Sequence, residues 1–228
     1  MKVSEKQFWD VEETRGFIYV KGWDTLDYKV WNEGQPETLQ RVADILADVR
    51  RDINTLLIYI HKNKEKWINH PIAFGIYHTF NLHTPNSDSK TFNSDNAINL
   101  INKNSGNELF NYQEMTPNLD GILGLNKPKE LVNIPVVYKN KKIYYELATK
   151  RSIFLTIRPK LTPGGHSRFP DFINDYNKIL DLAIHELTHT TCNDTRWKED
   201  NHRHPYPEYH KMMREFATNC GIINNNKK

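Results

Sequence analysis

Two histidines and a glutamate within five residues have the types and spacing of a hydrolytic metal site. The segment reads His185-Glu186-Leu187-Thr188-His189. On a helix, residues four apart lie one above the other with Cβ atoms roughly 5–6 Å apart, so both imidazoles can bind one ion. Glu186 then lies beside the ion, where a carboxylate can take a proton from metal-bound water. Zinc lowers the pKa of such water to about 7, so the motif predicts hydrolysis with Glu186 as general base.

A catalytic zinc site needs a third protein ligand and one open position. Three histidines and two glutamates follow the motif, and spacing alone does not choose among them. These candidates are His202, His204, His210, Glu208 and Glu215. His202 is the first histidine that the chain can bring back beneath the ion after Thr190.

Polar side chains beyond the motif are candidates to stabilise the transition state. Tyr206, His204 and Tyr209 can each donate a hydrogen bond to the oxyanion of a tetrahedral intermediate. Packing is the alternative role for each of them.

Two helices are predicted around these residues. The motif lies in a helix over about residues 171–191, which Asp171 can cap at its start. A last helix runs from about Tyr206 or Glu208 to Cys220 and ends at Gly221, because glycine adopts the left-handed conformation that terminates helices.

A long helix and several strands are expected to support the motif. From Glu37 to about Lys62, apolar residues recur every three or four positions, which predicts an amphipathic helix that begins after Pro36 and packs on a sheet. The β-branched and aromatic residues around Gly22 predict one or two short strands at Phe17–Trp31. A hairpin of Ile134–Tyr138 with Ile143–Leu147 is also predicted, and alternating residues predict a third strand, Ser152–Arg158, which Pro159 stops. Residues 1–36 and 81–129 are predicted to be loop-rich.

The strand predicted at residues 152–158 has a possible role in substrate binding. In zinc peptidases an extended substrate adds to the edge of the sheet near the catalytic helix, because backbone hydrogen bonds hold any peptide in register. This strand is the candidate edge or the neighbour of the edge. The alternative is an interior strand with no role in substrate binding.

Length and composition favour one domain over residues 1–228. The chain has 38% hydrophobic and 26% charged residues, which is ordinary for a globular protein. It has two cysteines, no apolar leader and no stretch apolar enough to cross a bilayer, so we expect an intracellular and not a secreted protein. The net charge of +3 is spread along the chain and gives little support to nucleic-acid binding.

Several of these segments together resemble the WLM, or SprT-like, zinc metallopeptidases, especially those encoded by large DNA viruses. The shared segments are the helix Ile184–His189, a later histidine followed four residues on by an aromatic residue, the end of the last helix at Ala217–Ile222, and the runs Tyr112–Asn118 and Ile153–Arg158. The family pattern maps its third histidine onto His202 and its aromatic residue onto Tyr206. The gap between His189 and His202 is longer than the compact family pattern, and His204 competes with His202.

The resemblance implies an α+β, zincin-like metallopeptidase domain with a small, mostly antiparallel sheet, a long supporting helix and an HExxH catalytic helix. Its core would cover residues 110–222, with Zn²⁺ held by His185, His189 and His202, and its substrate would be a protein or peptide. The expected location is the cytoplasm or nucleus of a host cell, or a virion. One alternative is a catalytically silent zinc protein that is structural or associated with virion proteins. A second is a protease that acts on DNA-bound proteins.

Overall fold

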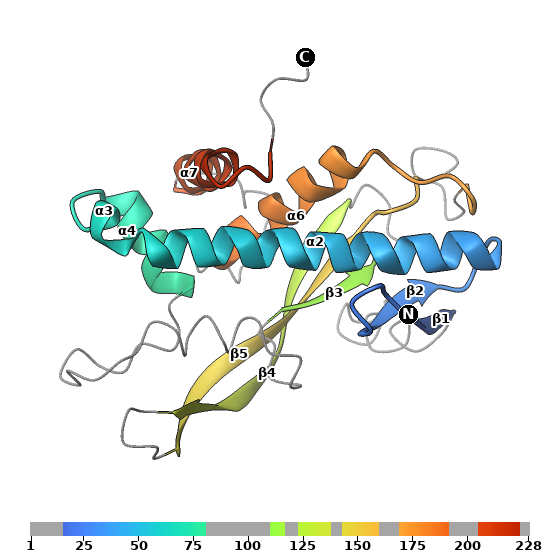
Figure 1. Cartoon of the computed structure of the whole chain (residues 1–228), viewed down its shortest axis with the longest axis horizontal. Coiled ribbons are helices and arrows are strands. Elements are labelled where there is room, and N and C mark those ends of the chain that lie inside the picture. The colour runs from blue at the N-terminus through green and yellow to red at the C-terminus, as the bar shows by residue number, and fades with distance from the viewer. Residues whose placement is uncertain are drawn as a thin grey trace, which may run out of the picture. The chain divides into compact units, whose positions relative to one another are not determined.

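The chain has an α+β fold, as the sequence predicts. The computed structural model describes residues 16–80, 110–116, 123–137, 143–159, 169–191 and 205–223 (Figure 1). The chain divides into two compact units. Unit 1 comprises Met1–Arg50, Tyr112–Leu125 and Phe154–Leu182, and unit 2 comprises Arg51–Asn111, Asn126–Ile153 and Ala183–Lys228. The single domain expected over residues 1–228 stays a prediction.

Unit 1 contains an antiparallel hairpin of two short strands. β1 (Phe17–Lys21) pairs with β2 (Asp27–Trp31). The turn contains Thr25 with φ 69, a left-handed conformation that is common in hairpin loops. The predicted strands are therefore confirmed, and the loop-rich prediction for residues 1–36 stays a prediction, because residues 1–15 lie outside the described part of the chain.

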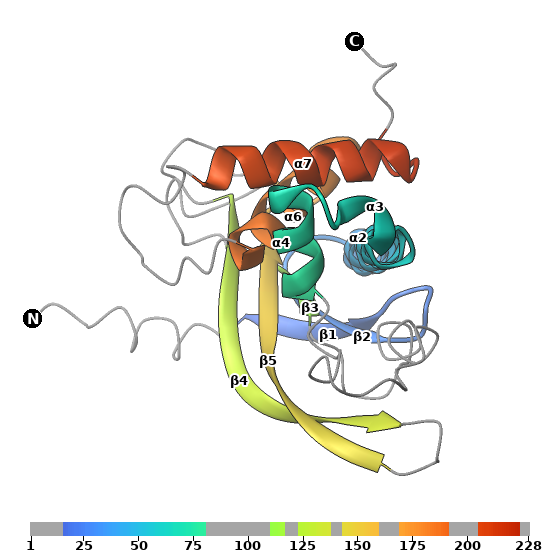
Figure 2. The same cartoon turned by 90° about the vertical axis from the view of Figure 1, so that its left-hand side faces the viewer.

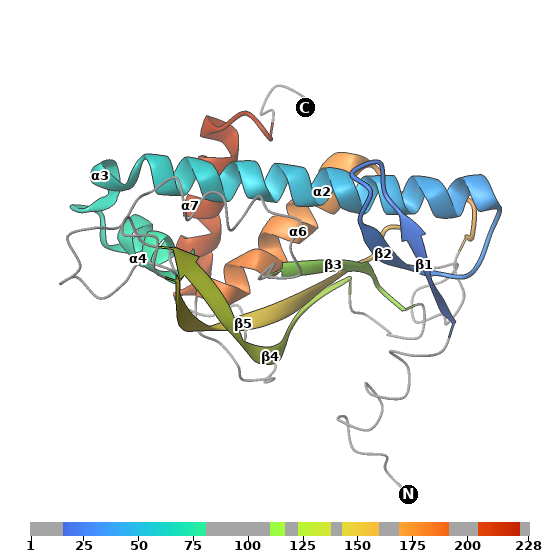
Figure 3. The same ribbon diagram turned by 60° about the horizontal axis from the view of Figure 1, so that its bottom comes forward.

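Helix α2 (Pro36–Lys62) confirms the predicted long amphipathic helix. Proline fits its first position because the first N–H groups of a helix have no acceptor within that helix. Apolar residues at three- and four-residue steps are buried along one face: Val42, Leu46, Val49, Ile53, Leu56 and Ile60. The β1–β2 hairpin lies beside its first half, where Trp23 donates from its backbone N to Asp44 and from its Nε1 to Asp48 (Figure 3).

The second sheet has three strands in the order β3-β5-β4. They are β3 (Phe110–Glu114), β4 (Gly124–Val137) and β5 (Ile143–Leu155). β4 and β5 run side by side in opposite directions as a long curved ribbon (Figure 2). β5 lies between the other two strands, so it is an interior strand, and β4 is an edge of the described sheet.

Several strand predictions in this sheet are corrected. The strands expected at 143–147 and 152–158 are one strand, because no glycine or proline interrupts residues 143–155. The loop-rich prediction for 81–129 is wrong at β3 and at the start of β4, while residues 81–109 lie outside the described part. Pro128 and Pro135 argue against a strand when the sequence is considered alone. They fit β4 because an edge strand tolerates residues that have no N–H to donate.

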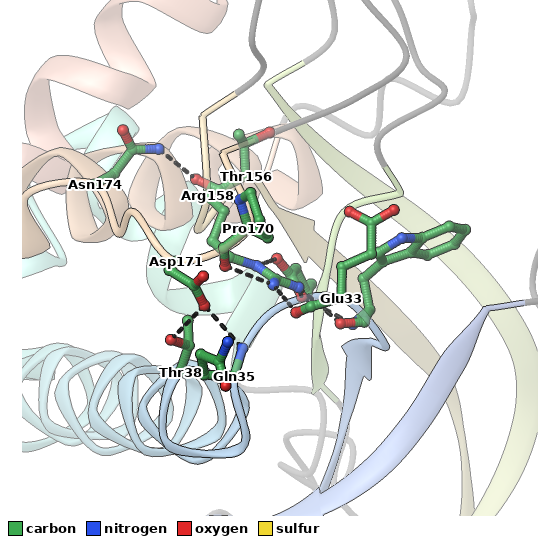
Figure 4. A network of polar contacts seen from close by, with 10 residues as sticks. Glu33, Gln35, Thr38, Thr156, Arg158, Pro170, Asp171 and Asn174 are labelled. Carbon is green, nitrogen blue, oxygen red and sulfur yellow. Dashed lines mark hydrogen bonds and ion pairs between the residues drawn. The ribbon is translucent and has the colours of Figure 1, made fainter.

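Unit 1 also holds the segment that leads to the helix with the histidine motif, and both predicted boundaries there are wrong. β5 ends at Leu155 rather than at Arg158, since the carbonyls of Thr156 and Ile157 accept hydrogen bonds from Asn174 instead of from a strand (Figure 4). Helix α6 is Tyr176–Thr191, and it begins five residues later than expected. Asp175 caps it by accepting from the backbone N of Asn177 at 2.9 Å.

Asp171, the predicted cap of this helix, serves a different helix. Its Oδ1 accepts from the backbone N of Gln35 at 2.8 Å and from Thr38 Oγ1 at 2.9 Å, at the start of α2 (Figure 4). The hydrogen bond from Gln35 holds the pKa of Asp171 below its ordinary value. Asp171 therefore caps α2 across a large separation in sequence.

Unit 2 contains the other helices. They are α3 (Lys64–Trp67), α4 (Pro71–Phe80) and α7 (Tyr206–Asn219). α4 and α7 pack closely, because a Cβ on Gly75 would lie 2.6 Å from the Tyr209 hydroxyl. α7 is followed by Gly221 with φ 83, as predicted. Among the described residues, no helix has the length and apolar character needed to cross a membrane.

Candidate metal centre

Helix α6 holds His185 and His189 on one side, with the apolar residues of the motif turned to the core. Ile184 and Leu187 are fully buried, whereas both histidines are half-buried. Their Nε2 atoms are 3.3 Å apart and their ring centroids 5.1 Å apart. The four-residue spacing places both rings on the same side of the helix.

The separation of the two nitrogens fits a shared metal ion. Zn–N bonds of about 2.0–2.1 Å at a tetrahedral angle place two ligand nitrogens about 3.3–3.4 Å apart. The observed 3.3 Å between Nε2 of His185 and Nε2 of His189 lies in that range. It is long for a hydrogen bond between two imidazoles. The residues present therefore fit two ligands of a zinc site.

Glu186, between the two histidines in sequence, is buried with an exposed fraction of 6%. No hydrogen bond from the described part of the chain acts on the pKa of its carboxyl group. Burial raises its pKa to about 8, because the charged form loses its hydration. A raised pKa makes the carboxylate a stronger base whenever it is ionised.

Helix α7 brings Tyr206 and His210 to the two histidines. The Tyr206 hydroxyl donates to the carbonyl of His185 at 3.2 Å, and its ring lies 5.3 Å from the His185 ring and 4.6 Å from that of His189. The His210 ring lies 5.5 Å from that of His185 and stacks on Tyr206 at 5.6 Å. Tyr206, the aromatic residue of the predicted pattern, therefore contacts the motif. His210, one turn further along α7, contacts His185 and Tyr206.

The other predicted site residues have different positions. His202 and His204 lie outside the described residues, so the third ligand stays a prediction. Glu208 and Glu215 are exposed on α7, and Glu208, two residues from Tyr206, does not share its face. Tyr209 has its hydroxyl against Gly75 of α4. Within the described ranges, no three histidine, cysteine, aspartate or glutamate side chains form a group able to hold a metal.

Sequence reasoning missed two residues beside the motif. Asn126 of β4 donates from Nδ2 to the carbonyl of Glu186 at 2.7 Å and to Thr190 Oγ1 at 2.7 Å. Arg151 of β5 donates from Nη1 to Asn126 Oδ1 at 3.3 Å. Asn126 falls in a segment that was expected to be a loop, and no local pattern links it to residues 60 positions away.

Comparisons with protein-family models, curated proteins and solved structures found no match in any of the three. What supports a function is therefore the arrangement of the side chains on α6, α7 and β4.

Proposed function

We propose that this chain is a zinc-dependent metallopeptidase with a zincin-like fold of the WLM, or SprT-like, type. The observation that carries the proposal is the 3.3 Å separation of His185 Nε2 and His189 Nε2, which fits two ligands of one zinc ion. Glu186 follows the first of these ligands and is buried. Two histidine ligands for one metal ion, with an adjacent carboxylate, are the groups that zinc-dependent hydrolysis uses.

His185 and His189 would hold the zinc, and His202 is the proposed third ligand. Bound zinc would act as a Lewis acid that polarises a carbonyl and makes water more acidic at neutral pH. Tyr206 holds the carbonyl of His185 through its hydroxyl, at 3.2 Å, and covers both imidazole rings. Tyr206 therefore supports the turn of helix that carries the first proposed ligand, and its role as a transition-state stabiliser stays a prediction.

Glu186 is the proposed general base. A base must be able to take a proton from water at neutral pH and to release it to the leaving amine. Burial raises the pKa of Glu186 to about 8, which makes its carboxylate a stronger base, and the charge of a bound zinc would favour the ionised form. Burial is the only cause that acts on the pKa of this carboxyl group, and no hydrogen bond from the described residues contributes to it.

β4, an edge of the described sheet, is the proposed place for the substrate. Asn126, near the start of β4, contacts the Glu186 carbonyl of α6, so this part of the edge lies beside the motif. An extended peptide added to an edge strand is held by backbone hydrogen bonds, largely independent of its sequence. The substrate class that follows is an unfolded or extended segment of protein.

The test compares zinc content and cleavage in four variants and the unaltered chain. An unstructured protein is the substrate. Glu186→Gln should retain zinc and lose cleavage, whereas His189→Ala should lose both. Zinc in the unaltered chain without cleavage of any of several unfolded proteins would refute the peptidase and leave a structural zinc protein. Zinc loss in His202→Ala but not in His204→Ala would establish the third ligand.

A further inference from the structure

The side chain of Asn126 ties the edge strand to the turn of α6 that carries Glu186. Its Nδ2 donates to the carbonyl of Glu186 and to Thr190 Oγ1, both at 2.7 Å. The two acceptors are one helical turn apart, and both residues are buried. An amide nitrogen has two protons, so both are used on this turn.

Arg151 determines which end of the Asn126 amide faces the helix. Its Nη1 lies 3.3 Å from Asn126 Oδ1. A guanidinium group only donates hydrogen bonds, so the atom that faces it must be the amide oxygen. The nitrogen then points at α6, where a carbonyl can only accept. The contacts of Asn126 with Arg151 of β5 and with Glu186 and Thr190 of α6 are therefore all consistent with one orientation of its amide.

We propose that Asn126, oriented by Arg151, is a positioning residue for the base of the reaction. The inference rests on the proposed function of Glu186. A shift of the 186–190 turn would move both the Glu186 carboxylate and the His189 ring. Misplacement of a reacting group by about 1 Å can lower the rate about 100-fold. Because β4 is also the proposed substrate edge, the same amide sets the distance between an added peptide and its base.

The sharpest variant is Asn126→Asp, since it keeps the size of the side chain and the acceptor for Arg151. It replaces the donor Nδ2 by an oxygen that faces the Glu186 carbonyl. Asn174→Asp is the matched control, because Asn174 also donates from Nδ2 to a backbone carbonyl, that of Thr156, at 3.1 Å. Thr190→Val removes one of the two acceptors and keeps the shape of the residue.

The kinetic readout separates positioning from general stability. In Asn126→Asp we expect kcat to fall about 10- to 100-fold with KM within about twofold, because the substrate still binds the edge strand. Asn174→Asp should keep the kcat of the unaltered chain, and Thr190→Val should lie between the two. In a chain that cleaves protein, equal kcat in Asn126→Asp and Asn174→Asp overturns the proposal.

A second readout does not need activity. Amide hydrogen exchange of residues 185–191 should be about tenfold faster in Asn126→Asp and unchanged in Asn174→Asp, because only the first variant frees this turn. Unchanged exchange in Asn126→Asp overturns the proposal whether or not the chain is a peptidase. Faster exchange in a chain that binds zinc but cleaves nothing supports the anchoring by Asn126 and refutes the proposed function instead.

Discussion

Two buried glutamates, one in each unit, have opposite surroundings. Glu114 of unit 1 accepts from Arg158 Nε at 2.7 Å, from Arg158 Nη2 at 2.8 Å and from the backbone N of Trp31 at 2.8 Å. For Glu186 of unit 2, no hydrogen bond from the described residues acts on the pKa of its carboxyl group, and burial raises that pKa to about 8. The three hydrogen bonds and the ion pair of Glu114 hold its carboxylate in place within the fold. A buried carboxylate without donors costs stability, and under the proposed function Glu186 serves as the general base.

Arg158 explains why the first glutamate is structural. Its guanidinium donates to the carbonyls of Trp31, Glu33 and Pro170 as well as to Glu114 (Figure 4). Both side chains of the ion pair are fully buried, at 0% exposure. A buried ion pair of this kind costs much when one partner is removed, because the other charge stays in the interior.

Exchanging each glutamate for glutamine should separate the two roles most strongly. Glu186→Gln should lower kcat by about 10²–10⁴-fold, the usual contribution of a general base, and should not lower the free energy of unfolding. Glu114→Gln should lower that free energy by about 3–5 kcal/mol and leave kcat of the folded chain unchanged. Urea unfolding and initial rates at neutral pH measure both. The opposite pattern would contradict the division of roles.

Arg158→Met tests the structural side alone. We expect the free energy of unfolding in urea to fall by about 3–5 kcal/mol, because Glu114 keeps a buried charge without its cation. The double variant Arg158→Met/Glu114→Met should be less destabilised than Arg158→Met. The control is Lys21→Met, which breaks the exposed ion pair with Asp27 (67% and 56% exposed) and should cost at most about 1 kcal/mol. Equal losses in Arg158→Met and Lys21→Met would be inconsistent with a buried pair.

His61 is a second buried titratable group of unit 2, and it should make the stability of the fold depend on pH. Its Nε2 has no hydrogen-bond partner among the described residues, and burial, with the nearby charge of Lys64, lowers its pKa from 6.5. The Tyr77 ring lies 6.2 Å away and adds no charge at neutral pH. The folded chain thus resists protonation of His61.

The stabilising contribution of neutral His61 is present above the unfolded pKa of 6.5 and is lost as the pH falls from there towards the folded pKa. The loss is at most about 1.4 kcal/mol per pH unit, the slope for one proton. His61→Gln should flatten the acid side of the stability profile. Urea unfolding of both proteins at several pH values below neutrality measures this, and parallel profiles would speak against it.

The smallest effect is expected for two tyrosines on α7. Tyr206→Phe removes the hydrogen bond to the His185 carbonyl and should lower the free energy of unfolding by about 1 kcal/mol. Tyr209→Phe, whose hydroxyl packs on Gly75, should change it by less than about 0.5 kcal/mol. Thermal unfolding of the two variants side by side measures the difference. A larger loss of unfolding free energy in Tyr209→Phe than in Tyr206→Phe would contradict the assignment of a stabilising hydrogen bond to Tyr206 and of packing alone to Tyr209.

Predictions from the sequence succeeded for helices in which residues a few positions apart share one face. α2 matches its prediction to within a residue, and α6 places His185 and His189 together, because both depend on spacing within a few residues. They failed where the partner is distant. Asp171 was assigned to the nearest helix although it caps α2, and Asn126 gave no sign of its contact with Glu186. No local pattern contains such pairs.

The distant pairs of unit 1 also have a consequence for how the chain acquires its structure. Asp171 and Gln35 are 136 residues apart, Arg158 and Trp31 are 127 apart, and Glu114 and Trp31 are 83 apart. Contacts of such high sequence separation slow folding, because a long loop must close before any of them forms. During synthesis, the β1–β2 hairpin leaves the ribosome long before Arg158 exists. The hydrogen bonds of Trp31 and Gln35 to these distant residues can therefore form only after the second half of the chain has been synthesised.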